Sequence, residues 1–443
     1  MKGTDRHGLT HDLILPTLLF AALGGMTWAV RGCSGYGGSM GCVFAGVTWG
    51  AAWWFIARDP GGPQSRRYSS GWIILALTVG IGFSGARGWM QWSSFFEGKL
   101  LTNYGQGEFV PISRAYGFLW LFIAGMPWAG LGACLLAWCG AKRPARITGW
   151  TLRIACGVGA AYLAGVLFDH FPEVFLPLYK TLKSQYQDFE ANPNLRRLIN
   201  DNRAAIVHLG LYLGFLAYEA GRRDWKNVTL ISTVGMVNGL GWALCQNWKW
   251  APGLWPQAQF NWWRCWESSG GISIGVAYGI AYYLVNRKGT ASPERTSVNG
   301  ERFGLYLGLL LGLGLSIRSG LKGWANIYLG NEEYWSGVLW MFMGPLMLIG
   351  LAVLLAWPVL RPLPKNFQGD AFPHAYGMVW AVIITQNILA QLVTGPHSQW
   401  SEVAFSIYYV LLFLITAVIL HHFQYVKTCG STQRFGGLSD GCF

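Results

Sequence analysis

Apolar runs of about 20 residues recur along the whole sequence, and short segments with Gly, Pro and basic residues separate them. A helix needs about 20 apolar residues to cross ~30 Å of hydrocarbon, so each run predicts one spanning helix. The pattern therefore predicts an all-α integral membrane protein with about twelve transmembrane helices. We place these helices at 13–30, 39–57, 71–90, 115–138, 149–168, 203–221, 228–247, 270–286, 303–322, 335–357, 372–393 and 403–424.

Composition supports a membrane protein and argues against nucleic acid as its partner. Only 12% of the residues are charged, against roughly 25% in soluble domains. The 25 Trp fit a protein that meets the lipid–water interface, where Trp is enriched. The net charge of +13 would suggest nucleic acid in a soluble protein, but no RNA- or DNA-binding motif accompanies it. We expect the lipid bilayer and a small solute as partners, no metal and no cofactor, and leave a homo-oligomer open.

The basic residues predict the orientation of the chain. If the N-terminus is inside, every inner connection is basic and the outer connections are much poorer in Lys and Arg. Both termini are then cytoplasmic, in a cell or inner membrane. The long outer segment 169–202 is expected to form a cap with some amphipathic helix. The basic residues of the inner connections are Arg58, Arg66, Arg67, Lys142, Arg143, Arg146, Arg222, Arg223, Lys226, Arg287, Lys288, Arg295, Arg302, Arg361 and Lys365.

The chain also repeats itself at an offset of about half its length. Two segments, at 31–38 and 264–271, both read R-x5-G-G. Further pairs follow in the same order, including Gly117-Phe-Leu-Trp120 with Gly337-Val-Leu-Trp340, and Pro172-Glu173-Val174 with Ser401-Glu402-Val403. This order predicts two parallel six-helix repeats, 1–225 and 226–443, an internal symmetry that is typical of secondary transporters.

The plan of six plus six helices resembles the major facilitator superfamily in outline. That family has the pattern G-x3-D-R-x-G-R-R after its second helix. Here the corresponding connection reads Arg58-Asp59-Pro60-Gly61-Gly62, followed by Arg66-Arg67, which is basic but does not match. The resemblance therefore covers architecture alone and implies no site residues.

The doubled R-x5-G-G predicts an anion site. Gly-rich turns that open a helix expose N–H groups at the positive end of the helix dipole, and an Arg adds a fork of donors. Alternatively, the two arginines anchor the chain at the interface and the glycines let helices pack. The predicted substrate-binding residues are Arg31, Gly37, Gly38, Arg87, Arg264, Glu267, Gly270, Gly271 and Arg318, and the candidates for ion coupling are Glu267 and Glu402.

Three further features of the sequence, a group of amides, a group of Trp residues and a pair of cysteines, each have two interpretations. The amides of Gln386, Asn387 and Gln391 either bond neighbouring helices together or line a solute path. The Trp residues that crowd 248–266 either form an interfacial belt or stack on a planar ligand. Cys33 and Cys265, at nearly matching places, either form a bridge or stay as two thiols.

Function is predicted in three alternatives. The first is a transporter, or a solute-binding membrane protein, for a small anionic or sugar-like solute, without catalytic residues. The second is a membrane-embedded transferase acting on a lipid-linked or envelope sugar, with Asp169, His170 or Glu173 as acid–base groups. The third is a non-catalytic subunit of a larger complex. The repeat favours the first by analogy of architecture.

Overall fold

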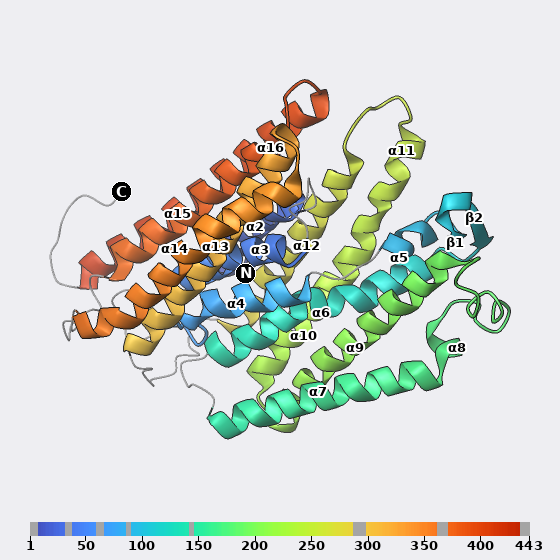
Figure 1. The fold of residues 1–443 in the computed structure, drawn as a ribbon. Helices are drawn as coiled ribbons and strands as arrows, with labels where there is room; N and C mark the ends of the chain where they lie inside the picture. The colour runs from blue at the N-terminus through green and yellow to red at the C-terminus, as the bar shows by residue number, and fades with distance from the viewer. Residues whose placement is uncertain are drawn as a thin grey trace.

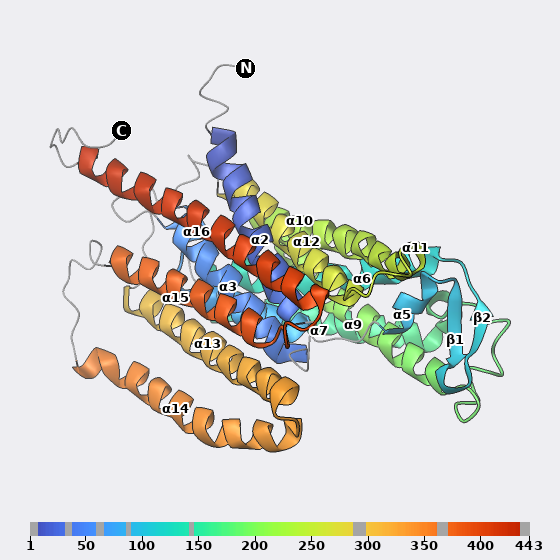
Figure 2. The same ribbon diagram turned by 90° about the horizontal axis from the view of Figure 1, so that it is seen from above.

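Long helices, which lie side by side in a bundle, make up most of the protein (Figure 1 and Figure 2). The computed structural model describes residues 8–31, 38–58, 66–85, 90–140, 146–286, 298–360 and 371–434. In the described residues, 8 helices are long and apolar enough to cross a membrane. The expectation of a helical, multi-pass membrane protein is thereby supported.

Each predicted apolar run coincides with a helix. The short helix α4 has 13 residues, about 20 Å of rise, which is less than the ~30 Å of a hydrocarbon core. That all twelve helices cross the bilayer therefore stays a prediction. The helices are α2 (Leu15–Arg31), α3 (Gly38–Ala57), α4 (Trp72–Ser84), α6 (Ala115–Gly140), α7 (Ile147–His170), α9 (Pro193–Gly221), α10 (Trp225–Cys245), α12 (Trp262–Val285), α13 (Val298–Tyr328), α14 (Glu332–Leu360), α15 (Ala371–Leu392) and α16 (Trp400–Arg434).

Shorter elements fill the connections. The segment between α4 and α6 contains an antiparallel hairpin that was not predicted, with Leu100 opposite Val110 and a left-handed Gly107 (φ 70°) after its turn. The short elements are η1 (Thr10–Ile14), α5 (Met90–Phe95), β1 (Lys99–Asn103), η2 (Tyr104–Gln106), β2 (Glu108–Pro111), α8 (Pro172–Phe175), η3 (Gln246–Trp250) and α11 (Ala251–Leu254).

The segment predicted as a cap, 169–202, consists of α8, a run of turns and the first residues of α9, which begins well before the predicted position 203. Two buried side chains hold its backbone. The Tyr186 hydroxyl donates to the Pro177 carbonyl at 2.9 Å, and the Asn202 amide donates to the Phe175 carbonyl at 2.9 Å. The segment is thus a fixed part of the fold.

Helix α2 lies at the centre of the bundle. It packs along α12, and the two helices are antiparallel. Glycines make the contact unusually close: a Cβ on Gly24 would overlap the carbonyl of Gly271, and a Cβ on Gly275 would overlap that of Phe20. Close backbone approach at small residues is a common way for membrane helices to associate. Helices α3, α15 and α16 also pack against α2.

Other helices pack as neighbouring pairs around this centre. Helix α10 lies along α6, α3 along α4, and α7 along α9. Helix α14 lies at the edge and packs on α13, and none of its most apolar stretch is buried (Figure 2). An apolar helix with an open surface suits contact with lipid.

The described helix contacts do not show the predicted two-fold repeat. Such a repeat would relate α2 to α10 and α3 to α12, so α10 should lie along α3 as closely as α2 lies along α12. Instead, α3 packs mainly against α2, α4, α13 and α15, whereas α10 packs mainly against α6, α9 and α12. The division at 225 and 226 therefore remains a prediction from the sequence.

The contact between α2 and α12 can be tested at Gly271. In Gly271→Ala the added methyl group meets the backbone of α2, and overpacking of this kind costs about 1–3 kcal/mol. We expect a lower thermal unfolding midpoint for the purified protein in detergent. Gly159→Ala in α7 is the matched control, because a Cβ there meets nothing within 4 Å. Equal midpoints for the two variants would contradict the close packing.

Candidate functional site

Helices α2 and α12 run between two ends of the bundle, which we name after arginines. At the Arg264 end, α2 finishes at Arg31 and α12 begins at Trp262. At the Arg67 end, Arg66 pairs with Asp12 of η1 at 2.9 Å and donates to the Asn286 carbonyl, just after α12, at 3.1 Å. The sequence predicts the Arg264 end to be outside and the Arg67 end to be cytoplasmic.

Two predicted site residues from opposite halves of the chain form a buried ion pair at the Arg264 end. The Arg31 Nη1 lies 2.9 Å from Oε2 of Glu267, and the two side chains are 8% and 1% exposed. Arg31 also donates to the Gly85 carbonyl at 3.0 Å and to the Cys42 sulfur at 3.2 Å, and its guanidinium lies 4.8 Å from the Trp28 ring centre. A solute anion at Arg31 would have to displace Glu267.

The predicted helix start at Gly270 is wrong. Helix α12 already begins at Trp262, so Gly270 and Gly271 lie in its interior, where helix bonds occupy the backbone N–H groups. Gly270 faces the ring of Trp242, and Gly271 faces α2. These glycines serve helix packing, the second interpretation of the doubled motif. Gly38 is the first residue of α3, whereas Gly37, Arg87 and Cys33 lie outside the described residues.

A cavity of about 440 Å³ opens at the Arg264 end, between α12, α13 and the turn from α15 to α16. Two predicted residues, Arg264 and Glu402, line it together. The turn folds back at Gly395, where φ is 98° and a side chain would be strained. The residues around the cavity are Asn261, Arg264, Ile327, Val393, Thr394, Gly395, Pro396, Ser398, Gln399 and Glu402.

Arg264 is fixed in the wall of this cavity. It lies in the first turn of α12, where the Asn261 side chain accepts its backbone N–H at 3.0 Å and so caps the helix. Its guanidinium donates to the Thr394 carbonyl at 3.3 Å and lies 4.8 Å from the ring centre of Phe405. The residue is 4% exposed, so its charge is largely removed from bulk water.

Glu402 lies across the turn from Arg264 and supplies a carboxylate to the same cavity. Its Oε2 accepts the Ser401 hydroxyl at 2.7 Å, which orients the group. The cavity thus combines a buried guanidinium, a half-buried carboxylate and several neutral polar side chains. Such a set can hold a small solute with an anionic group and hydroxyl groups.

A polar layer continues inward from this cavity along α12 and α16. Ser268, one turn after Arg264, bonds to the Gly25 carbonyl at 2.8 Å and to the Tyr408 hydroxyl at 2.7 Å. The amide of Gln386 donates to the Leu23 carbonyl at 3.0 Å, and Gln391 donates to the Ser406 carbonyl at 3.4 Å. The predicted bonding of helices by amides is confirmed here.

Other predicted site residues lie elsewhere. Arg318 donates to the Ser336 carbonyl at 3.1 Å and lies 4.6 Å from the Trp340 ring centre, so it fastens α13 to α14. Asp169 is held by both nitrogens of an Arg203 fork, at 2.9 and 2.8 Å, and not by His170. The imidazole of His170 bonds instead to a backbone carbonyl.

The crowded Trp residues stack largely on one another. Trp262 stacks on Trp248 and on Trp255, with ring centres 6.0 and 5.6 Å apart. Trp266 packs against Trp242 and Trp263 at 5.1 and 4.8 Å. Much of this aromatic surface is therefore occupied by other rings.

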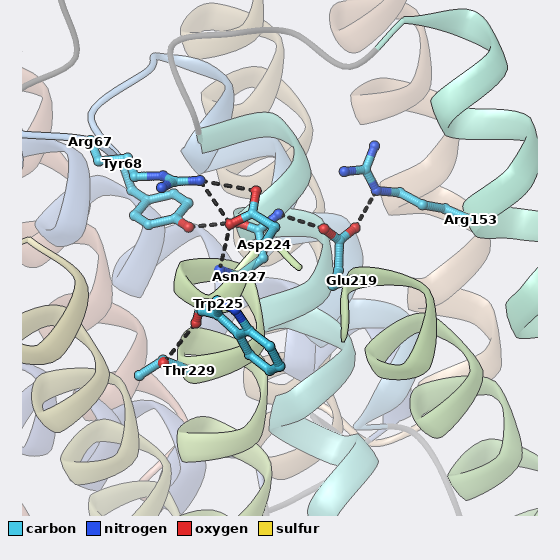
Figure 3. A network of polar contacts seen from close by, with 8 residues as sticks. All are labelled: Arg67, Tyr68, Arg153, Glu219, Asp224, Trp225, Asn227 and Thr229. Atoms are coloured by element: carbon cyan, nitrogen blue, oxygen red, sulfur yellow. Dashed lines mark hydrogen bonds and ion pairs between the residues drawn. The ribbon is translucent and has the colours of Figure 1, made fainter. Parts of the chain in front are cut away.

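The Arg67 end holds a polar network that sequence reasoning missed (Figure 3). Glu219 at the end of α9 is fully buried, pairs with Arg153 of α7 at 2.5 Å and accepts the Asn227 amide at 2.8 Å. The Tyr68 hydroxyl donates to the Asn227 side-chain oxygen at 2.5 Å, and Asp224 accepts from Arg67 at 2.9 Å. Burial raises the pKa of the Tyr68 hydroxyl. Charged residues inside predicted spans, Arg153 and Glu219, were the available signal.

None of the known protein families, curated proteins or solved structures with which the chain was compared matches it. The geometry of the chain's own residues therefore carries the functional argument.

The buried ion pair predicts that neutralising Glu267 lowers the stability of the protein much more than neutralising Asp169. Glu267→Gln leaves the charge of Arg31 buried and uncompensated, which costs about 3–5 kcal/mol. Asp169→Asn removes a pair whose side chains are nearly half exposed, which costs about 0–1 kcal/mol. We expect a much lower thermal unfolding midpoint for the first variant only.

A double variant separates charge burial from packing. In Arg31→Met with Glu267→Leu, both charges are removed, so the loss of stability should be smaller than in Glu267→Gln alone. If the double variant is at least as unstable as Glu267→Gln, the unpaired charge of Arg31 is not the main cause of the lost stability.

Proposed function

We propose that the protein is a multi-pass transporter in the cell membrane for a small anionic or sugar-like solute, with both termini cytoplasmic. The observation that carries the proposal is the cavity at the Arg264 end, which Arg264 and Glu402 both line. Its volume of about 440 Å³ falls within the roughly 300–1,000 Å³ of small-molecule sites.

The chemistry of the cavity favours a hydroxylated anion, such as a hydroxy acid or a sugar acid. The guanidinium of Arg264 places a positive charge in the cavity wall, and its burial strengthens the attraction for a carboxylate or phosphate. The carboxylate of Glu402 accepts hydroxyl groups, and the side chains of Asn261, Thr394 and Gln399 add neutral partners. Glu402 would repel a second negative charge on the solute.

Ion pairs at the Arg67 end support transport by alternating access, although the Arg264 end also holds the Arg31–Glu267 pair beside its cavity. The Arg264 end has an open polar cavity. The Arg67 end is held by ion pairs that join distant segments: Arg66 with Asp12 at 2.9 Å, Arg67 with Asp224 at 2.9 Å, and Arg58 with Glu301 at 3.2 Å. A transporter that is open on one side needs such a closure on the other.

Glu402 is the better candidate for proton coupling. Glu267 is engaged by Arg31 in a buried pair, whereas Glu402 lines the cavity itself and is half-buried. A proton taken up by Glu402 would remove one negative charge as the anionic solute enters, so proton and solute would move together.

Solute binding is tested first in Arg264 variants. The purified protein is screened by thermal unfolding against hydroxy acids, sugar acids and neutral sugars, because a ligand of the folded state raises the midpoint. We expect a carboxylated solute to stabilise the wild type. Arg264→Gln should weaken its binding by about tenfold or more, since a lost bond to a charged group costs about 1.5–3 kcal/mol. Arg264→Lys, which keeps the charge but loses the fork, should bind with intermediate affinity.

The matched control is Arg203→Gln, which removes an arginine that is 47% exposed at its side chain and lies outside the cavity. It should leave solute affinity unchanged. A solute whose binding survives Arg264→Gln in a well-folded protein would rule out this cavity as its site. Uptake that needs sealed vesicles would then separate transport from the transferase alternative, which predicts product in detergent.

A further inference from the structure

A second cavity, of about 530 Å³, lies at the Arg264 end on the far side of the bundle, under the 169–202 segment. Helix α9 ends at the Arg67 end, next to Asp224, so its first turns and the preceding segment belong to the opposite end. The cavity is open on one side and bordered by α6, α8, the turns after α8 and α9. Its lining residues are Tyr116, Leu119, Trp120, Ile123, Glu173, Val174, Phe175, Leu176, Leu178, Tyr179, Lys180, Thr181 and Ile206.

One wall of this cavity is aromatic and rigid. Trp120 is 3% exposed and stacks on Trp92, with ring centres 5.9 Å apart and an interplanar angle of 11°. The Trp92 ring nitrogen donates to the Asn202 side-chain oxygen at 2.8 Å, and the Asn202 amide donates to the Phe175 carbonyl at 2.9 Å. This chain of contacts fixes the aromatic wall of α6 to the segment that covers it.

The rim is polar and carries both signs of charge. Glu173 supplies a carboxylate, Lys180 an ammonium group and Thr181 a hydroxyl, all from the covering segment. Between them, Leu178 has a positive φ of 56°, an unfavourable conformation for a leucine. The Tyr186 hydroxyl, bonded to the Pro177 carbonyl, holds the chain next to this residue. Strained backbone that is held by buried bonds is typical of binding sites.

We propose that this second cavity binds an uncharged sugar. A sugar ring has an apolar face of C–H groups, which packs on an aromatic ring, and a girdle of hydroxyl groups, which bond to carboxylates, ammonium groups and hydroxyls. The half-buried rings of Tyr116 and Tyr179, which line the cavity in front of the buried Trp120, and the rim supply these two surfaces. The charges of Glu173 and Lys180 cancel, which favours a neutral ligand over an anion.

The test measures binding of neutral mono- and disaccharides to the full-length protein by isothermal titration. The detergent must carry no sugar headgroup, because an alkyl glycoside would itself compete for the site. The test variant is Glu173→Gln with Lys180→Gln. The matched control is Lys183→Gln with Glu190→Gln, which changes the same two residue types in the same segment at exposed positions that do not line the cavity.

We expect saturable binding of at least one neutral sugar to the wild type and the control, and a loss of about tenfold or more in affinity in the test variant. Arg264→Gln should leave this affinity unchanged, which keeps the second cavity distinct from the proposed solute site. The proposal is overturned if no neutral sugar binds at millimolar concentration, or if the test and control variants weaken binding equally.

Discussion

Close backbone contact between α2 and α12 positions the charged groups at both ends of the bundle. Glycines on both helices remove the side chains that would hold the backbones apart. As a result, Arg31 at the end of α2 reaches Glu267 of α12, and Asp12 before α2 reaches the Arg66 that also bonds to Asn286 after α12. In a low-dielectric interior an ionised carboxylate or guanidinium is costly unless its partner lies within bonding distance. The small residues therefore matter for electrostatics as much as for packing.

The sequence predicted the helices well because their cause is local. A run of about 20 apolar residues forms a helix in lipid whatever its neighbours, since all its backbone bonds are internal. The start of α12 was misjudged because Trp262, Arg264 and Glu267 are amphipathic or charged and interrupt the apolar run. They are helical because Asn261 caps the helix, Arg31 on α2 compensates the charge of Glu267, and the Thr394 carbonyl in the α15–α16 turn accepts a hydrogen bond from Arg264.

Which residues meet across the fold was not predictable from spacing alone. Arg31 and Glu267 were both named as site residues, but their pairing depends on α2 lying against α12, which no local pattern specifies. Arg66 and Arg67 illustrate the same limit. They fit the rule for basic cytoplasmic connections, yet in the structure they also bind Asp12 and Asp224. An arginine that fits the rule for orientation in the membrane can thus also join distant segments at one end of the bundle.

Two segments that resemble each other in sequence each contribute a carboxylate to a cavity, although the packing of whole helices does not show the predicted repeat. The segments Pro172-Glu173-Val174 and Ser401-Glu402-Val403, which share Glu-Val, both lie at the Arg264 end, and the carboxylate of each lines a cavity. Each cavity also has a cation, a buried Arg264 in one and an exposed Lys180 in the other. Burial is the important difference, because a guanidinium shielded from water attracts an anion strongly, whereas a solvated ammonium beside a carboxylate mainly donates hydrogen bonds. Under the two proposals, similar sequence at the two places would bind an anion at one and a neutral sugar at the other.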